Sequence, residues 1–287
     1  MKLTALVPAT AANLGPGFDC LGLALDLCNE VTIDTDAPPG VSWQGEGAGE
    51  LPTDGSDMTS LAMALLAREA GLPLPPLALH GLNRIPLERG LGSSAAAVVA
   101  GLCLADRLLG AGLALERLLE IAVDVEGHAD NVAAALFGGL VIAYRFEERW
   151  EVETLVPYPA LRPVVLVPEH VRLATAAARD ALPRAVPLGD AAFNAGRAAL
   201  MPLALTHRPD LLRAALEDRL HQPARLALVP EVRQVFERVR EAGVPVCVSG
   251  AGPSLLAFEG EGGTVPDLGP GWRILRVGPR AIGAEIT

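Results

Sequence analysis

The sequence predicts an α+β fold in two domains. Segments with the apolar pattern of strands are interleaved with longer segments of helical periodicity, and no internal repeat is evident. A proline-rich segment at 157–163 interrupts this succession and is the best place for a domain boundary. We therefore expect a first domain over residues 1–157 and a second over residues 158–287.

The first domain is expected to begin with two short strands separated by loops. Residues 3–7 form an apolar run, and residues 31–35 alternate Val and Ile with Thr and Asp. Gly and Pro are frequent at 8–19 and at 37–55, so both segments are expected to be loops. A buried strand is expected at 140–146, where the residues are mostly apolar.

Two helices are expected between these strands. Ser93 or Ser94 is suited to cap a helix over 95–109, whose first turns are nearly all Ala and Val. Leu and Ala recur at helical spacing over 113–125, which predicts the second helix. The second domain is expected to contain further helices at 211–220 and 231–241, the latter ended by Gly243, and strands at 164–167, 244–248, 254–258 and 272–277.

Charge and composition exclude several classes of protein. The chain has 23 basic and 34 acidic residues, a net charge of −11, and only 4% aromatic residues, so nucleic acid is not expected as a partner. Lys2 is the only lysine, which excludes mechanisms that need an internal lysine. The longest uncharged stretch in mid-chain, 90–105, is short for a membrane span, and residues 1–7 do not resemble a signal peptide. A cytoplasmic protein without a membrane partner is therefore expected.

The strongest motif is a glycine-rich turn that opens directly into a helix. Its two glycines allow close approach to the backbone, and unpaired N–H groups at a helix N-terminus bind anions. An ordinary serine-capped helix after a glycine turn is the alternative interpretation. The motif consists of Pro86, Leu87, Glu88, Arg89, Gly90, Leu91, Gly92, Ser93, Ser94, Ala95 and Ala96.

Two further glycine segments accompany this motif. Asn13-Leu-Gly-Pro-Gly-Phe-Asp19 follows the first predicted strand, and Ser249-Gly-Ala-Gly-Pro-Ser254 separates two predicted strands. Each by itself is more commonly a plain turn. Three such loops in one acidic chain favour a site for a phosphate or a nucleotide.

Polar residues are concentrated at the end of the second helix, in Glu126-Gly-His128-Ala-Asp130-Asn131. Helical spacing places Glu126 along the apolar face, where a carboxylate should be paired or bind a metal. Fraying of the helix before the glycine is the alternative, and it would expose Glu126 to solvent. A histidine such as His128 is more commonly structural, and a cap for the apolar segment 132–137 is the alternative interpretation of Asp130 and Asn131.

Together these segments resemble the three motifs of the GHMP kinase superfamily, and their flanking residues resemble its homoserine kinases. The resemblance runs from Pro8 to about Phe258. It implies an N-terminal α/β nucleotide-binding domain and a ferredoxin-like C-terminal domain, with the active site between them. Sibling kinases for other substrates place a lysine where this chain has Thr10.

The resemblance implies an ATP- and Mg²⁺-dependent enzyme of threonine biosynthesis that phosphorylates the side-chain hydroxyl of L-homoserine. The loop of residues 86–96 would wrap the ATP phosphates, and Ser94 and Glu126 would hold Mg²⁺. Asn131 would orient the attacking hydroxyl and Thr175 would bond the γ-phosphate, with no dedicated base. Asp57 stands where family members carry an asparagine that touches the adenine.

The resemblance also implies the residues that bind the amino acid. Asp19 would bind the ammonium group of homoserine, Arg179 and Arg225 would bind its carboxylate, and Asn13 and His128 would complete the pocket. Arginine suits this role because its planar fork matches a carboxylate. Another GHMP small-molecule kinase and a non-catalytic nucleotide-binding sensor remain the alternative functions, and a homodimer is possible.

Overall fold

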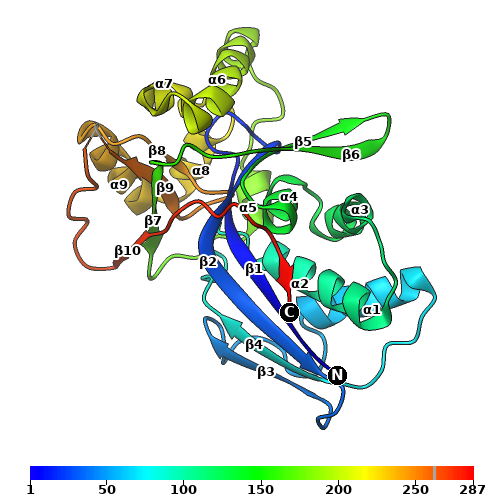
Figure 1. Ribbon diagram of the computed structural model, residues 1–287. Coiled ribbons are helices and arrows are strands. Elements are labelled where there is room, and N and C mark those ends of the chain that lie inside the picture. The colour runs from blue at the N-terminus through cyan, green and yellow to red at the C-terminus, as the bar shows by residue number, and fades with distance from the viewer. Residues whose placement is uncertain (261–262) are drawn as a thin grey trace.

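A computed structural model describes residues 1–260 and 263–287 and places two long antiparallel strands at the centre of the N-terminal part (Figure 1). β1 (Lys2–Ala12) and β2 (Leu21–Asp34) pair along almost their whole length, with a register shift between Pro8 and Ala9. They belong to a seven-stranded sheet of order β11-β1-β2-β4-β3, in which β5 also pairs with β2 and β6 pairs with β5. The remaining strands of this sheet are β3 (Gly40–Gly45), β4 (Ala78–Asn83), β5 (Leu140–Phe146), β6 (Arg149–Leu155) and β11 (Glu285–Ile286).

Four helices lie on one side of this sheet (Figure 1). They are α1 (Met58–Ala70), α2 (Ser93–Leu109), α3 (Leu115–Glu126) and α4 (Asp130–Phe137). The central helix α2 is nearly all small or aliphatic, and most of its residues are buried. Its Gly101 lies so close to α1 that an added Cβ would stand 2.3 Å from the carbonyl oxygen of Thr59.

The C-terminal part is built on a four-stranded antiparallel sheet of order β10-β7-β9-β8. Its strands are β7 (Arg162–Pro168), β8 (Val246–Val248), β9 (Leu255–Glu259) and β10 (Trp272–Arg276). The helices of this part are α5 (Thr175–Asp180), α6 (Leu188–Thr206), α7 (Leu212–Ala215), α8 (Gln222–Leu228) and α9 (Pro230–Glu241), with a 3₁₀ turn at Pro209–Leu211.

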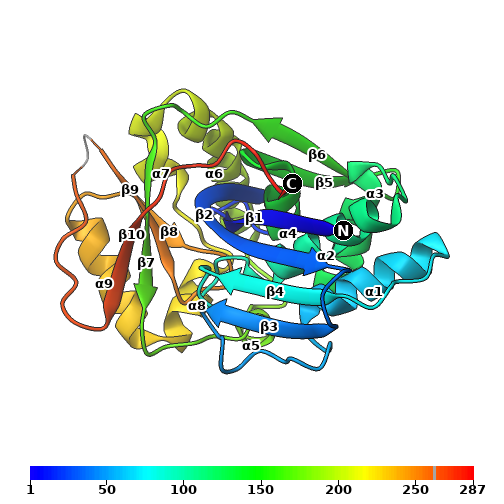
Figure 2. The same cartoon turned by 60° about the horizontal axis from the view of Figure 1, so that its bottom comes forward.

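Strand β7 joins the two parts because its two faces belong to different cores. Val165 and Val167 pack in the large core of the first sheet, whereas Val164 and Leu166 pack with α8 and α9. This two-sided burial explains the uninterrupted apolar run of the strand. Figure 2 shows the end of the chain crossing from β10 back to the first sheet, where β11 pairs with β1.

The predicted α+β class is confirmed, as are the strand at 140–146 and the helices at 95–109, 113–125 and 231–241. The loops predicted at 8–19 and 37–55 are wrong in part. Residues 8–12 stay paired with β2 across the register shift, and β3 lies within the second segment. Pairing with a neighbouring strand, which local composition does not reveal, keeps both segments extended.

Two further predictions about helices are corrected. The helix predicted at 211–220 is helical over Leu212–Ala215 only, because the Asp218 carboxylate accepts backbone N–H groups that follow it. Neither Ser93 nor Ser94 caps α2. Its N-cap is Gly92, with φ 66° and no side-chain hydrogen bond. In the described part of the chain, no helix has the length and apolarity that crossing a membrane requires.

Two helical glycines provide a test of this packing. We expect Gly101→Ala to destabilise the protein by about 1–3 kcal/mol, because the methyl group would overlap the backbone of α1. Gly196→Ala in α6 has open space around the added carbon and should stabilise by about 0.5–1 kcal/mol. Urea denaturation measures the change in the free energy of unfolding of each variant. Equal changes in the two variants would contradict the close contact at Gly101.

Candidate active site

The three glycine segments of the sequence lie against one another. The backbone N–H of Gly250 donates to Ala12 O at 3.0 Å, and the Ser249 hydroxyl donates to Gly90 O at 2.7 Å. The N–H of Thr10 donates to Leu91 O at 3.0 Å. A Cβ on Gly90 would stand 2.2 Å from the carbonyl oxygen of Ser249, so this contact requires glycine. The three segments therefore form one interlocked unit between the two sheets.

A cavity of about 230 Å³ opens beside this unit. The loop before α2 and the N-terminus of that helix form one wall, from Glu88 to Ser94. The structure brings eight of the other polar residues singled out by the sequence to the same cavity, whereas Asp57 does not border it. They are Asn13, Asp19, Glu126, His128, Asn131, Thr175, Arg179 and Arg225.

The N-terminus of α2 forms the part of the wall that suits an anion. Gly90 and Gly92 have φ of 68° and 66°, so the chain turns sharply into the helix and leaves its first N–H groups open. Ser93 and Ser94 border the cavity, whereas Ala95 and Ala96 are buried in the core beneath. Small residues below the turn keep the approach to the backbone unobstructed.

Ser94 faces the end of α3. Its hydroxyl donates to the Glu126 carboxylate at 2.5 Å. The helix includes Glu126, so the fraying considered as an alternative is wrong. A hydroxyl and a carboxylate oxygen thus converge at the edge of the cavity.

The start of α4 presents an ordered polar group. Asp130 is buried, and its carboxylate accepts from the Asn131 N–H at 2.8 Å and contacts His128 Nδ1 at 3.1 Å. Burial by itself lowers the pKa of His128, but the hydrogen bond and charge of Asp130 outweigh it and raise that pKa. Thr10 donates to Asn131 Oδ1 at 2.8 Å, which turns the amide nitrogen away from Thr10.

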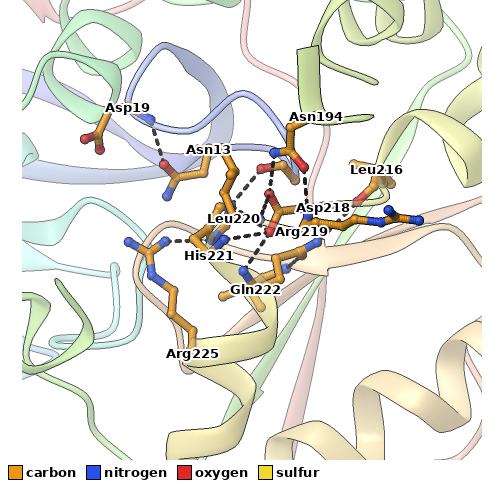
Figure 3. A network of polar contacts seen from close by, with 12 residues as sticks. Asn13, Asp19, Asn194, Leu216, Asp218, Arg219, Leu220, His221, Gln222 and Arg225 are labelled. Atoms are coloured by element: carbon orange, nitrogen blue, oxygen red, sulfur yellow. Dashed lines mark hydrogen bonds and ion pairs between the residues drawn. The ribbon is translucent and has the colours of Figure 1, made fainter. Parts of the chain in front are cut away.

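Asp19 and Arg179 meet across the cavity. Arg179 donates to the two Asp19 carboxylate oxygens at 2.8 and 3.0 Å, and this hydrogen bond raises the pKa of Arg179. Asn13 holds the Asp19 turn, since its Oδ1 accepts from the Asp19 N–H at 3.0 Å and its Nδ2 donates to Gly250 O (Figure 3). The pair is partly exposed, at 35% for Arg179 and 39% for Asp19.

Arg225 lies deeper, and its guanidinium has no carboxylate partner among the described residues. One nitrogen, Nη1, donates to Gly250 O at 2.7 Å and contacts His221 Nδ1 at 3.1 Å, while Nε has no partner in the described chain. Burial, reinforced by the nearby charge of Arg179, lowers the pKa of Arg225 to about 10. A buried cation of this kind is suited to bind an anion that enters the cavity.

The support of Arg225 is a feature that sequence reasoning missed. Figure 3 shows Asp218 at the centre of a buried network that ends at Arg225. The Asp218 carboxylate accepts from Asn194 Nδ2 at 2.7 Å and from the N–H groups of Leu220, His221 and Gln222. His221 Nε2 contacts Gly15 O at 2.7 Å and therefore carries a proton, because a carbonyl only accepts. Its Nδ1 is then the acceptor for Arg225, and burial lowers the pKa of His221, which keeps the ring neutral.

A second cavity, of about 400 Å³, continues from the N-terminus of α2. Ser93 and Ser94 border both cavities, and Trp43, Leu51, Pro52 and Met58 give the second one an apolar side. Leu87 also borders it, whereas Pro86 faces a separate cavity toward Arg273. Asp57 lies in this wall with its carboxylate engaged, because it caps α1 through the N–H and hydroxyl of Ser60 at 2.9 and 2.6 Å.

Comparison with protein families matches both parts of the chain. The model "GHMP kinases N terminal domain" matches residues 58–139, which include the loop before α2 and the start of α4. The model "GHMP kinases C terminal" matches residues 200–261. The mevalonate kinase of L. major, at 17% identity and a TM-score of 0.66 over 89% of this chain and 86% of its own, shares the fold.

Named relatives show to which family of GHMP kinases the chain belongs. A homoserine kinase of Clavibacter michiganensis is 46% identical over 90% of this chain and 82% of its own length. One of Streptomyces avermitilis is 43% identical over 98% of this chain and 94% of its own. A crystal structure of homoserine kinase from Cytophaga hutchinsonii has a TM-score of 0.84 at 28% identity, covering 100% of this chain and 97% of that one. The chain therefore belongs to the homoserine kinase family of the GHMP kinases.

The structural role of Asp218 can be tested by a stability measurement that needs no enzyme assay. We expect Asp218→Asn to lower the free energy of unfolding by about 1–3 kcal/mol, because an amide replaces one acceptor oxygen with a donor that faces N–H groups. Asp210→Asn, which alters an exposed pair with Arg208, is the matched control and should unfold like the parent. Equal stability of all three proteins in urea would show that the network around Asp218 does not hold this turn.

Proposed function

We propose that this protein transfers the γ-phosphoryl group of ATP to the side-chain hydroxyl of L-homoserine, a step of threonine biosynthesis. The observation that carries the proposal is the pairing of an open helix N-terminus with Arg225, a buried cation without a carboxylate, in one cavity. The relatives named as homoserine kinases support the same substrate.

In this proposal, the first cavity would hold the phosphates of ATP and the second would hold its nucleoside. The loop from Pro86 to Ala96 would hold the phosphates, with its N–H groups and the dipole of α2 directed at negative charge. The apolar side of the second cavity would take the nucleoside. Because the Asp57 carboxylate is engaged by Ser60, it would border the base without bonding to it through a free carboxylate oxygen.

Ser94 and Glu126 would hold Mg²⁺. Both offer oxygen atoms, which Mg²⁺ prefers, and these converge to 2.5 Å at the edge of the cavity beside the loop. When bound, the ion would neutralise charge on the phosphate oxygens. Waters and phosphate oxygens would complete its coordination, as is usual for Mg²⁺ with few protein ligands.

The amino-acid substrate carries both charges and meets groups of both signs. Asp19 would bind its ammonium, and Arg179 and Arg225 would bind its carboxylate. Asp19 and Arg179 now satisfy each other, so a zwitterion placed between them would replace one ion pair with two. Asn13 and His128 would close the pocket around the same groups.

The transfer itself would depend on placement of the reacting groups. Asn131 would orient the attacking hydroxyl, and Thr175 at the start of α5 would bond the γ-phosphate. Asp130 is the nearest carboxylate to Asn131, but its oxygen is engaged by His128 and by the Asn131 N–H. Phosphoryl transfer through a loose transition state needs positioning and charge neutralisation more than a base, which fits this arrangement.

The decisive experiment measures ADP release from Mg-ATP with a panel of acceptors. L-Homoserine should support turnover, whereas mevalonate, galactose, L-threonine and L-serine should not. Turnover with another acceptor would assign the chain to a different substrate and remove the roles of Asp19, Arg179 and Arg225. ATP binding without turnover on any acceptor would favour a nucleotide-binding sensor.

We expect Glu126→Gln to lower kcat by about 100-fold or more, because one full charge opposite the phosphates is lost. Homoserine binding, measured by calorimetry, should be retained because Glu126 belongs to the phosphate side of the cavity. Glu120→Gln, on the outer face of the same helix, is the control. Full activity of Glu126→Gln across a Mg²⁺ titration would exclude the metal role.

We expect Arg225→Lys to raise the KM for homoserine by about tenfold or more with a smaller effect on kcat, since lysine keeps the charge and loses the fork. Arg219→Lys, at an exposed arginine six residues earlier, should leave both constants unchanged. An unchanged KM in Arg225→Lys, with activity retained, would remove Arg225 from the carboxylate site.

A further inference from the structure

The loop after β3 is an acidic segment for which the proposed reaction gives no role. It carries Glu46 and Glu50, and both carboxylates are bound by arginines of the C-terminal part. Arg172, in the segment between β7 and α5, donates through both terminal nitrogens to Glu50, with Nη2 at 2.7 Å from Oε1. The same guanidinium lies 3.9 Å from the carboxylate of Glu88 in the loop before α2.

The Arg172 side chain and its two carboxylate partners lie at the wall of the 400 Å³ cavity. Glu50, Glu88 and Arg172 all border it, next to Ser93 and Ser94. Among its described lining residues, Arg172 is the only basic one, while Glu50, Asp57 and Glu88 are acidic. A nucleotide phosphate at this point would therefore face more negative than positive side-chain charge.

The nearby cation Arg89 is not available to such a phosphate. Its guanidinium donates to the carbonyl oxygens of Pro168, Glu169 and Leu87 at 2.9, 3.0 and 3.3 Å, and the side chain is buried. It fastens the loop to the end of β7. Arg172, by contrast, is 45% exposed, and its partners Glu50 and Glu88 are 52% and 54% exposed.

Exposed ion pairs of this kind contribute little to stability, because water screens them and both side chains lose freedom. A phosphate offers arginine the same bidentate geometry with more negative charge. Exchanging the Glu50 carboxylate for a phosphate would thus cost little, because Arg172 would keep a partner of the same geometry that carries more negative charge.

We propose that Arg172 leaves Glu50 and Glu88 to bind the phosphates of the nucleotide, so that Glu50 competes with the nucleotide for this arginine. The proposal rests on the proposed function only in taking the second cavity as the nucleotide site. Arg172 is three residues before Thr175, so its movement would also draw the start of α5 toward the phosphates.

Competition predicts effects of opposite sign for the two partners of one ion pair. Arg172→Gln should weaken ADP binding by about tenfold or more, since a charge-assisted bond to phosphate is lost. Glu50→Gln should strengthen ADP binding by about two- to fivefold, because the competing carboxylate is gone. The double variant should bind ADP like Arg172→Gln, and adenosine, which has no phosphate, should bind all four proteins equally.

The test is calorimetric titration of ADP and of adenosine into the parent, the two single variants and the double variant. Arg172→Lys is a further variant that keeps the charge. Arg273→Gln and Glu46→Gln alter a separate ion pair between the two parts, at residues that border neither cavity of the nucleotide site, and should leave the ADP affinity within about twofold. If Glu50→Gln weakens ADP binding as Arg172→Gln does, the pair is a structural clamp and the proposal is overturned. Unchanged ADP affinity in Arg172→Gln overturns it as well.

Homoserine turnover by the parent protein is measured first, because it tests the proposed function separately from the competition between Glu50 and the nucleotide. A parent that binds ADP without phosphorylating homoserine refutes the proposed function, while the signs of the Arg172 and Glu50 variants still decide the competition. A parent that turns over homoserine, with Glu50→Gln no tighter for ADP, refutes the competition alone.

Discussion

The contact of Gly90 with residues 249–252 is the constraint on which the rest of the site depends. The backbone atoms approach so closely that a Cβ on Gly90 would stand 2.2 Å from Ser249 O and 2.8 Å from Gly252 O. Because Gly90 leads into α2 and residues 249–254 join β8 to β9, this contact fixes the helix N-terminus relative to the second sheet. Arg225, which bonds to Gly250 O, is thereby placed at a set depth from the phosphate loop.

An acidic protein that binds polyanions must provide positive potential locally. Here the sources of positive potential are the backbone N–H groups at the start of α2 and a few arginines. These arginines differ in how firmly the protein holds their side chains. Arg89 is bound by three carbonyl oxygens, and Arg225 is bound by Gly250 O and His221. Arg179 and Arg172 are each paired with a partly exposed carboxylate, and Arg179 also lies over the Phe18 ring. The first two arginines are anchored to backbone carbonyl oxygens, whereas the other two are the ones that the proposals above expect to change partner when a ligand binds.

The sequence predicts the class of fold and the residues that line the cavity better than it predicts local caps and turns. Helical spacing places Glu126 at the end of a helix, as the structure confirms. The family resemblance names Asn13, His128 and Arg179, and all three line one cavity. The extension of β1 to Ala12 depends on pairing with β2, which composition does not reveal. The role of Asp57 as a cap was readable in principle, because Ser60 follows at the spacing of a capping residue.

The network around Asp218 was out of reach of sequence reasoning for a different reason. His221 contacts Gly15, 206 residues away in the chain, and its tautomer follows from that contact alone. Only the neutral ring with its proton on Nε2 can accept from Arg225, so a turn after β1 determines the hydrogen bond that orients an arginine on α8.

A comparable chain of contacts begins at Gly92. A Cβ there would lie 2.0 Å from the Thr10 hydroxyl, and that hydroxyl in turn donates to Asn131 Oδ1. The glycine that turns the loop toward the phosphates thus also leaves room for the side chain that orients the Asn131 amide. Because Thr10 bonds the amide oxygen, the amide nitrogen, which lies 3.5 Å from Asp130 Oδ1, is the group that the proposed function would use to bond a substrate hydroxyl.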